Sequence, residues 1–266
     1  MKTVKNIKKI TSAMKLVAAS KLRKAQVDME KSRVMVAPFV RILGDHPTIK
    51  GEKNLTVPCS TDRGLCGGIN TAVTRYSRAT FNAVGAEGSQ YVVIGEKGKA
   101  QMQRTDSSHF AQTIGDVTKT RLTFAAASTF AEMILKEEPD TVRLVFNKFQ
   151  SAISFKPTIA TVLSGEKMQE ALAAQGALDK YEVEGPEDEA ELAANLSEFQ
   201  LATYLFNGLL ENQTSENASR MQAMENSTKN ASEMIDKLAI TYNRARQASI
   251  TTELIEIISG ASALEG

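Results

Sequence analysis

The sequence has few of the residues on which most catalytic sites depend. The 266-residue chain contains no tryptophan, 6% aromatic residues, two cysteines and two histidines. Cys59 and Cys66 form neither a CxxC pair nor a zinc-finger spacing, and so low a cysteine count suits a reducing compartment. His46 and His109 lie far apart in the sequence, and no cluster of metal-ligating residue types adjoins either. We therefore expect no catalytic triad, no histidine-rich metal site and no cofactor.

Long hydrophobic runs are also missing. No stretch approaches the roughly eighteen consecutive apolar residues of a membrane-spanning helix, so we expect any membrane contact to be made through partners. The chain is 42% hydrophobic and 24% charged, with a formal net charge of +1, which is ordinary for a globular protein. Its length suffices for one mid-sized domain with an extension or for two small domains. The scarcity of aromatic residues predicts a core of aliphatic residues, alanine and methionine.

Proline and glycine are almost absent from the C-terminal part of the chain. Between residues 191 and 259 there is no proline, and Gly208 is the only glycine. Apolar or small residues recur there at spacings of three and four, which predicts a long helix packed along one partner helix. These residues are Met221, Met224, Thr228, Ala231, Ile235, Leu238, Tyr242 and Ala245. At about 1.5 Å per residue, such a helix could extend for roughly 100 Å.

The last turns of this helix have a different pattern. Their apolar residues surround the helix instead of forming one stripe, and they are Ile250, Leu254, Ile255, Ile257, Ile258 and Ala261. A helix that is apolar on all sides must be enclosed by other structure. We therefore expect the C-terminal tip to sit in a socket.

Residues 1–43 predict a second long helix. Apolar residues keep mostly three-and-four spacing, at Ile7, Ile10, Met14, Ala18, Leu22, Ala25, Met29, Val36 and Leu43. Pro38 predicts a kink or an end near Ala37. The simplest way to bury both apolar stripes is to pack the two long helices against each other as an antiparallel two-stranded coiled coil.

The N-terminal helix is strongly basic. From residue 1 to residue 33 there are ten lysines and arginines against two acidic residues, a net charge of +8. The pattern fits a solvated charged face, a mitochondrial presequence or a surface that binds something acidic. A presequence is disfavoured because no small-residue processing site interrupts the periodicity. Single-stranded nucleic acid is disfavoured because no aromatic residues are interleaved for stacking. Among acidic partners, we favour an acidic protein surface over nucleic acid or lipid head groups.

The middle of the chain has a different composition. After a linker at 44–53, short apolar runs typical of strands alternate with helical patterns, which predicts a small α/β domain with a largely parallel sheet. The predicted strands are 54–60, 90–95, 140–146 and 152–163, the last interrupted at Pro157. One predicted helix follows the turn at 61–68 and ends at about Val84. The other predicted helices span 96–104, 121–137 and 167–179. An acidic loop is predicted at 182–191. We therefore expect a coiled-coil helix at 1–43, a Rossmann-like domain at 54–185 and a second coiled-coil helix at 191–266.

Two glycine-containing loops are candidate phosphate sites. Asp62-Arg63-Gly64-Leu65-Cys66-Gly67-Gly68 lies between a predicted strand and a helix, but its spacing is not G-x-G-x-x-G. Gly95-Glu96-Lys97-Gly98-Lys99 lacks the hydroxyl residue of a P-loop. A tight turn, or a loop whose Asp and Arg grip a neighbouring protein, explains the first sequence better than a nucleotide site does.

Charged residues on the C-terminal helix allow two interpretations. Glu253 and Glu256 could form an acid–base pair, but no nucleophile or metal ligand lies near them in sequence, so a solvated or partner-facing role is favoured. Arg220, Arg244 and Arg246, with Gln247, could be exposed flanks of the coiled coil. Their forked donors could equally bind carboxylates of a surrounding subunit.

Three segments carry a family resemblance. KNIKKITSAMKLVAASKLRKAQ at 5–26, STDRGLCGGIN at 60–70 and YNRARQASITTELIEIISGASAL at 242–264 resemble the γ subunits of F-type ATP synthases, and the likeness covers essentially the whole chain in the same order. Family members usually begin a few residues earlier, which suggests that Met1 is internal to a longer mature chain. The paired-cysteine insertion of chloroplast members is absent, and ITTELIEIISGASALE looks closer to mitochondrial than to bacterial members.

The resemblance implies a rotor shaft without catalytic residues, cofactor or metal. Its implied partners are α and β subunits in a 3:3:1 assembly, the δ and ε stalk subunits and the c-ring, on the matrix side of the mitochondrial inner membrane or, as a second choice, at a bacterial membrane. Proton flow would turn the c-ring and the shaft, and the shaft would change the conformations of the catalytic β subunits in turn. Implied contacts to the hexamer are Met14, Lys15, Asp62, Arg63, Cys66, Arg220, Arg246, Gln247, Thr251, Glu253, Ile257 and Ile258.

Two rival functions remain open from the sequence. The basic segment allows a coiled-coil protein that binds nucleic acid, for which duplex binding should depend strongly on salt. The glycine loop allows a nucleotide-dependent α/β enzyme, which should bind nucleotide saturably as an isolated chain.

Overall fold

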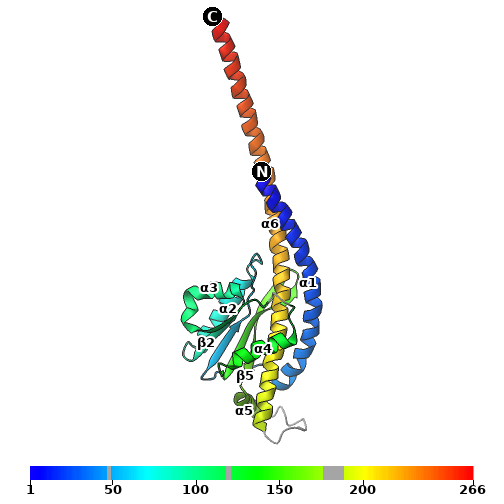
Figure 1. Cartoon of the computed structure of the whole chain (residues 1–266), viewed down its shortest axis with the longest axis vertical. Helices are drawn as coiled ribbons and strands as arrows, with labels where there is room; N and C mark the ends of the chain where they lie inside the picture. The colour runs from blue at the N-terminus through cyan, green and yellow to red at the C-terminus, as the bar shows by residue number, and fades with distance from the viewer. Residues whose placement is uncertain (47–48, 118–120, 176–188, 266) are drawn as a thin grey trace. The chain divides into compact units, whose positions relative to one another are not determined.

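The computed structural model describes residues 1–46, 49–117, 121–175 and 189–265. By contacts the chain divides into two compact units, Met1–Val17 with Ala223–Gly266, and Ala18–Gln222. Two long helices, α1 (Lys2–Leu43) and α6 (Glu189–Glu265), contribute to both units (Figure 1). The units are taken separately below.

The larger unit contains a five-stranded sheet in the order β3-β2-β1-β4-β5. Its strands are β1 (Asn54–Pro58), β2 (Ser89–Ile94), β3 (Phe110–Ile114), β4 (Thr141–Ser151) and β5 (Ser154–Leu163). The pairs among β3, β2, β1 and β4 are parallel, whereas β4 and β5 form an antiparallel hairpin. The remaining helices are α2 (Ile69–Val84), α3 (Glu96–Asp106), a 3-10 turn (Ser107–His109), α4 (Phe124–Leu135) and α5 (Gly165–Gln175).

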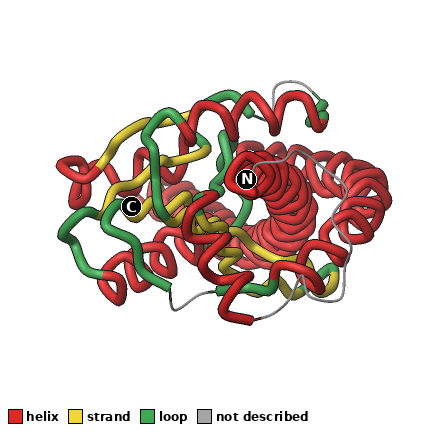
Figure 2. Tube along the Cα trace, turned by 90° about the horizontal axis from the view of Figure 1, so that it is seen from below, coloured by secondary structure: helices red, strands yellow, loops and turns green. Residues whose placement is uncertain are grey.

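Helices cover both faces of this sheet, as the view from below shows (Figure 2). On one face, Tyr91 and Val93 of β2 pack against α2 and α3. On the other face, alternate residues of β1, β2 and β4 pack against α4 and against α6 around Leu201 and Leu205, both fully buried. This alternation within β2 follows from the two-residue period of a strand. The sheet is therefore a buried platform on which α6 rests directly.

In both units α1 and α6 run antiparallel. In the larger unit Leu22 and Met29 of α1 pack against Leu210 and Ala218 of α6. In the smaller unit Met224 and Ala231 are buried, and three polar contacts also join the helices, with residue numbers that rise on one helix as they fall on the other. These are Lys8 Nζ to Ser232 Oγ (3.1 Å), Thr11 Oγ1 to Thr228 Oγ1 (2.7 Å) and Lys15 Nζ to Glu225 Oε1 (2.7 Å).

The structure confirms the expected fold class, an α/β domain with two long terminal helices in an antiparallel pair. The predicted interruption of the last strand is wrong, because β5 runs unbroken through Pro157. Since β5 is an edge strand paired only with β4, the missing N–H of proline can face outward. The strand β3 was not expected at all.

Helix ends agree with the predictions at α1 and differ at α4. Helix α1 ends at Leu43, as predicted, and continues through Pro38 instead of ending near Ala37; Phe39 and Leu43, which follow the proline, pack into apolar clusters. Helix α4 begins at Phe124, three residues later than expected, with Thr123 as its N-cap. The predicted end of α5 after Gln175 and most of the acidic loop at 182–191 lie outside the described residues.

Candidate partner-binding surfaces

The C-terminal tip of α6 is exposed on every side. Within the smaller unit, all residues from Ile240 to Ala261 are exposed. Ile257 is 70% exposed and Ile250, Leu254, Ile255 and Ile258 are between 54% and 57% exposed. Burying one such side chain contributes roughly 1.5–3 kcal/mol. A continuous apolar tip is therefore a surface that another protein would cover.

Among the described residues of the tip, polar side chains that form hydrogen bonds form them within the tip itself. Thr251 Oγ1 donates to the Gln247 carbonyl at 2.9 Å, and Ser249 Oγ donates to Glu253 Oε1 at 3.3 Å. Arg246 and Gln247 are exposed, as are Thr251 and Glu253. The structure thus brings together on one helix end six residues that the resemblance implies as contacts: Arg246, Gln247, Thr251, Glu253, Ile257 and Ile258.

The loop between β1 and α2 is pinned to α6 from one side. Ser219 Oγ donates to the Cys66 carbonyl at 2.6 Å, and Arg220 donates to the Gly64 carbonyl at 3.4 Å. Gly67 has a φ of 63°, and a Cβ there would lie 2.9 Å from Ser219 Oγ, so glycine is required by both conformation and space. Leu65 also has a positive φ, 59°, and its side chain is 65% exposed. The loop is rigidly held and presents a leucine outward.

The N-terminus of α3 is already occupied by this same loop. Three successive backbone N–H groups are satisfied there: Glu96 by Asp62 Oδ1 (3.3 Å), Lys97 by the Thr61 carbonyl (2.9 Å) and Gly98 by Ser60 Oγ (2.9 Å). A phosphate would need those donors. Gly95 and Gly98 therefore allow α3 to pack closely against Ser60, which follows β1. The segment 95–99 is not a phosphate-binding loop.

A buried ion pair supports the loop from α6. The side chains of Arg220 and Glu216 are 14% and 6% exposed, and they form an i, i+4 pair. Burial raises the pKa of Glu216, while the charge and hydrogen bond of Arg220 oppose that rise. The interpretation of Arg220 as an exposed flank of the coiled coil is wrong, because the side chain lies against its own glycine loop. Cys66 is 2% exposed, and burial raises the pKa of its thiol as it raises that of Cys59 to about 12.

The family model described as ATP synthase matches residues 1–264. A mitochondrial ATP synthase subunit γ from Ipomoea batatas is 51% identical over 272 residues, covering 100% of this chain and 83% of the relative. The chain belongs to the family of ATP synthase γ subunits. The mitochondrial F(1) complex subunit γ of Rattus norvegicus is 39% identical, covering 100% of this chain and 97% of the relative.

Solved structures agree with this family assignment. A chain of the Tetrahymena thermophila mitochondrial ATP synthase central stalk and c-ring matches with 27% identity and a TM-score of 0.66, covering 82% of this chain and 99% of that chain. A chain of the Euglena gracilis mitochondrial ATP synthase matches at 23% identity and a TM-score of 0.79, over 99% of this chain and 92% of that chain, and shows the shared fold. The γ-family assignment leaves the nucleic-acid-binding interpretation without support.

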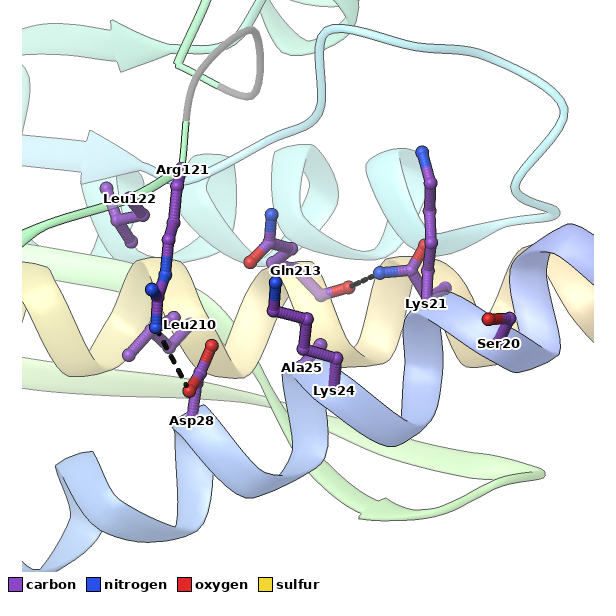
Figure 3. Close-up of a pocket in the computed structure, with 10 residues that line it drawn as sticks. Ser20, Lys21, Lys24, Ala25, Asp28, Arg121, Leu122, Leu210 and Gln213 are labelled. Atoms are coloured by element: carbon purple, nitrogen blue, oxygen red, sulfur yellow. Dashed lines mark hydrogen bonds and ion pairs between the residues drawn. The ribbon is translucent and has the colours of Figure 1, made fainter.

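The basic helix of this γ-family chain borders a cavity of about 290 Å³ in the larger unit. Lys21 and Lys24 of α1 and Arg121, just before α4, bring positive charge to it, above a floor that includes Leu122 and Leu210. Figure 3 shows Arg121 reaching toward Asp28, to which it is ion-paired at 3.6 Å. Among the described residues Lys21 and Lys24 have no ion-pair partner. The cavity is therefore a net positive recess.

The two expected contacts on the first half of α1 lie in the smaller unit. Met14 is half-buried, and Lys15 is ion-paired with Glu225 at 2.7 Å with its side chain 37% exposed. Sequence reasoning missed two features of the larger unit, the cationic cavity and the outward Leu65. The cavity could be found only once the structure placed the segment before α4 beside α1. The outward direction of Leu65 could be found only from its backbone angle φ, which is unusual for a residue other than glycine.

Proposed function

We propose that this chain is the central rotor shaft of an F-type ATP synthase. Proton flow turns the membrane c-ring, the c-ring turns the shaft, and the shaft drives cyclic conformational changes in the catalytic β subunits. The single observation that carries this proposal is the tip of α6, which is exposed from Ile240 to Ala261 and whose large apolar side chains lie around the helix from Ile250 onward. Such a tip fits a sleeve formed by three α and three β subunits around one shaft.

The two parts of the chain have separate tasks in this proposal. The helices at 1–43 and 191–266 form the shaft, and the α/β domain at 54–185 contacts the c-ring and the δ and ε stalk subunits. No helix among the described residues is long and apolar enough to cross a membrane. The place of action is the matrix side of the mitochondrial inner membrane, where the chain meets the membrane through the c-ring.

Catalysis belongs to the partner subunits in this proposal, and the chain has no catalytic residues of its own. The observation in support is that the N-terminus of α3, one of the two strand-to-helix turns that carry glycines, has its N–H groups bonded to Ser60, Thr61 and Asp62. The chain acts on nucleotide affinity through contacts alone.

Contact residues follow from the exposed surfaces. Arg246, Gln247, Thr251 and Glu253, with Ile257 and Ile258, face the sleeve. Met14 and Lys15 lie near an acidic loop of a β subunit, and a carboxylate of such a loop enters the recess between Lys21 and Lys24.

The pinned glycine loop is the second contact region. Asp62 and Arg63 meet a β subunit beside the exposed Leu65. Cys66 and Arg220, which are buried in the chain, hold this loop in place from behind.

The mechanism rests on asymmetry. One shaft inside a ring of three β subunits presents a different face to each of them, so their nucleotide affinities differ. Rotation exchanges these affinities among the three sites. Contacts at the tip must be weak enough to re-form at each angle, because a contact that favours one angle strongly would hold the rotor there.

Co-purification tests the proposal. An affinity-tagged chain should isolate α and β subunits in a 3:3:1 ratio, and a variant that ends at Ala245 should lose assembly or coupling. The matched control carries the tag at the same place on the full chain. Recovery of the full chain without α and β subunits would overturn the proposal, and so would full coupling by the truncated variant.

A further inference from the structure

A single buried carboxylate joins both long helices to the sheet. Glu211 of α6 has a side chain that is 1% exposed. It accepts hydrogen bonds from Arg33 Nε at 2.5 Å and Arg33 Nη2 at 2.9 Å, and from the Phe149 backbone N–H at 2.8 Å. Arg33 Nη2 also donates to the Phe149 carbonyl at 2.7 Å. Three elements that are distant in sequence, α1, β4 and α6, therefore meet at one charged group.

Neighbouring residues extend this junction along α6. Asn207 Nδ2 donates to Ser32 Oγ of α1 at 2.8 Å. On the sheet side, Asn147 Nδ2 of β4 donates to Asn212 Oδ1 at 3.0 Å, and Ser215 Oγ donates to the Asn147 carbonyl at 2.9 Å. All these groups belong to the larger unit. One stretch of α6 is thus bonded to α1 and to β4 through polar groups.

Polar bonds of this kind fix an angle, which apolar contacts do not. The free energy of apolar burial does not depend on direction, so apolar contact restricts small rotations of a helix less narrowly than a directional hydrogen bond does. A forked bond between an arginine and a carboxylate has a fixed planar geometry. Turning α6 about its axis would break that fork and leave the Glu211 carboxylate unpaired in the interior, where an isolated charge is strongly unfavourable.

We propose that Glu211, with Arg33 and the β4 backbone at Phe149, is the torsional lock of the rotor. Within the larger unit it fixes the rotational position of α1 and α6 against the sheet, so that these parts of the two helices turn together with the sheet. Glu211 is a positioning residue in this role and touches no substrate. The inference rests on the proposed rotor function.

The test measures torsional stiffness in the assembled motor. A bead is attached through Gln90→Cys at the exposed position of β2, and the native cysteines are buried, which makes the attachment selective. The variant Glu211→Gln keeps the shape of the side chain and removes its charge. Since a charge-assisted bond is roughly twice as strong as a neutral one, the angular variance of the bead within each catalytic pause should rise about twofold. ATP hydrolysis should stay close to that of the parent.

Two controls separate a lock from general stability. Asp106→Asn breaks the ion pair in which Arg78 Nε donates to Asp106 Oδ2 at 2.8 Å, but this pair joins only α2 and α3. Ile134→Val removes a methyl group from the fully buried core side chain of α4. Both should lower the melting temperature without changing the angular variance.

Each outcome decides the inference. An increased variance in Glu211→Gln alone supports the lock, whereas a variance equal to that of Asp106→Asn overturns it. If Glu211→Gln fails to assemble, Arg33→Lys keeps the charge but not the fork, and it must raise the variance for the lock to stand. A parent chain that assembles with no rotating complex would instead overturn the proposed function, which distinguishes the two failures.

Discussion

Two stretches of the same helix differ in almost every respect. Between Leu201 and Ser219, α6 is buried against the sheet and α1, and most of its polar side chains there are hydrogen-bonded inside the chain. Between Ile240 and Ile258, α6 is exposed, and the side chains of Thr241, Ser249, Thr251 and Thr252 bond to residues four positions away on the helix itself. The first stretch contains a buried polar segment at 211–217, where a core would be apolar, and the second carries exposed isoleucines and a leucine from Ile250 onward, where a surface would be polar. The difference teaches that the buried stretch fixes an angle and the exposed stretch permits angles to change.

Leucine-to-alanine substitutions at the two stretches should break this comparison most clearly. Leu205 is 0% exposed and Leu254 is 56% exposed. Leu205→Ala should lower the free energy of unfolding by about 2–5 kcal/mol, because it opens a cavity between α6 and the sheet. Leu254→Ala should change it by less than about 0.5 kcal/mol, as for other surface substitutions. Urea unfolding of the chain measures both values.

In the assembled complex, Leu254→Ala should affect function more than Leu205→Ala does, which is the opposite of their order for stability. There Leu254→Ala should reduce ATP synthesis, because it removes apolar surface that the sleeve covers. A loss of stability from Leu254→Ala in the free chain would show that the tip packs within the chain, contrary to the comparison.

Much of the fold could be predicted from local patterns. The runs at Leu55–Val57 and Val92–Ile94 are typical of buried strands, and both lie in the sheet. The absence of proline and glycine predicted α6 across its whole length. The apolar tip could also be predicted, since residues such as Ile257 and Ile258 leave no polar face.

The buried polar stretch of α6 could not be predicted. Residues 211–217, ENQTSEN, have the composition of a solvated helix, and only the positions of Arg33, Asn147 and Phe149 on other elements show where their hydrogen bonds go. The sequence did contain one signal of this stretch. No apolar residue lies between Leu210 and Ala218, although the helix is expected to pack against a partner helix there. Strand β3 was missed because it is five residues long and follows a helix directly.

The glycine loop sharpens the comparison, because it depends on the last turn of the buried stretch. Gly67→Ala should lower the free energy of unfolding by about 1–2 kcal/mol, since alanine is unfavourable at a φ of 63°. Its new Cβ would also approach Ser219 Oγ to 2.9 Å. Gly68→Ala is the matched control, because Gly68 has a φ of −90° and a Cβ there meets nothing within 4 Å. Equal effects at the two positions, measured by thermal unfolding, would contradict the pinning of the loop by α6.

Glu216 tests the electrostatics of the buried stretch. Burial raises its pKa above the ordinary value of 4.5, so the folded chain holds this proton more tightly than the unfolded chain does. The resulting stability is present below pH 4.5 and is lost as the pH rises through the folded-state pKa. Glu216→Gln cannot titrate, so its stability relative to the parent should increase with pH over this range. Urea unfolding at a series of pH values measures the difference, and a difference that decreases with pH would mean that Arg220 outweighs burial.

The smallest effect should come from the ion pair between Lys15 and Glu225, which lies between the two stretches in the smaller unit. Its side chains are 37% and 56% exposed, so solvent screens the attraction. Lys15→Gln should change the free energy of unfolding by no more than about 0.5 kcal/mol. Lys5→Gln on the same helix is the control, because Lys5 is exposed and has no ion-pair partner within the described part of the chain. If Lys15 contacts an acidic loop of a β subunit, its substitution should alter the salt dependence of ATP hydrolysis in the complex while Lys5→Gln leaves it unchanged; an equal salt response of the two variants would assign Lys15 to the pairing of the two helices alone.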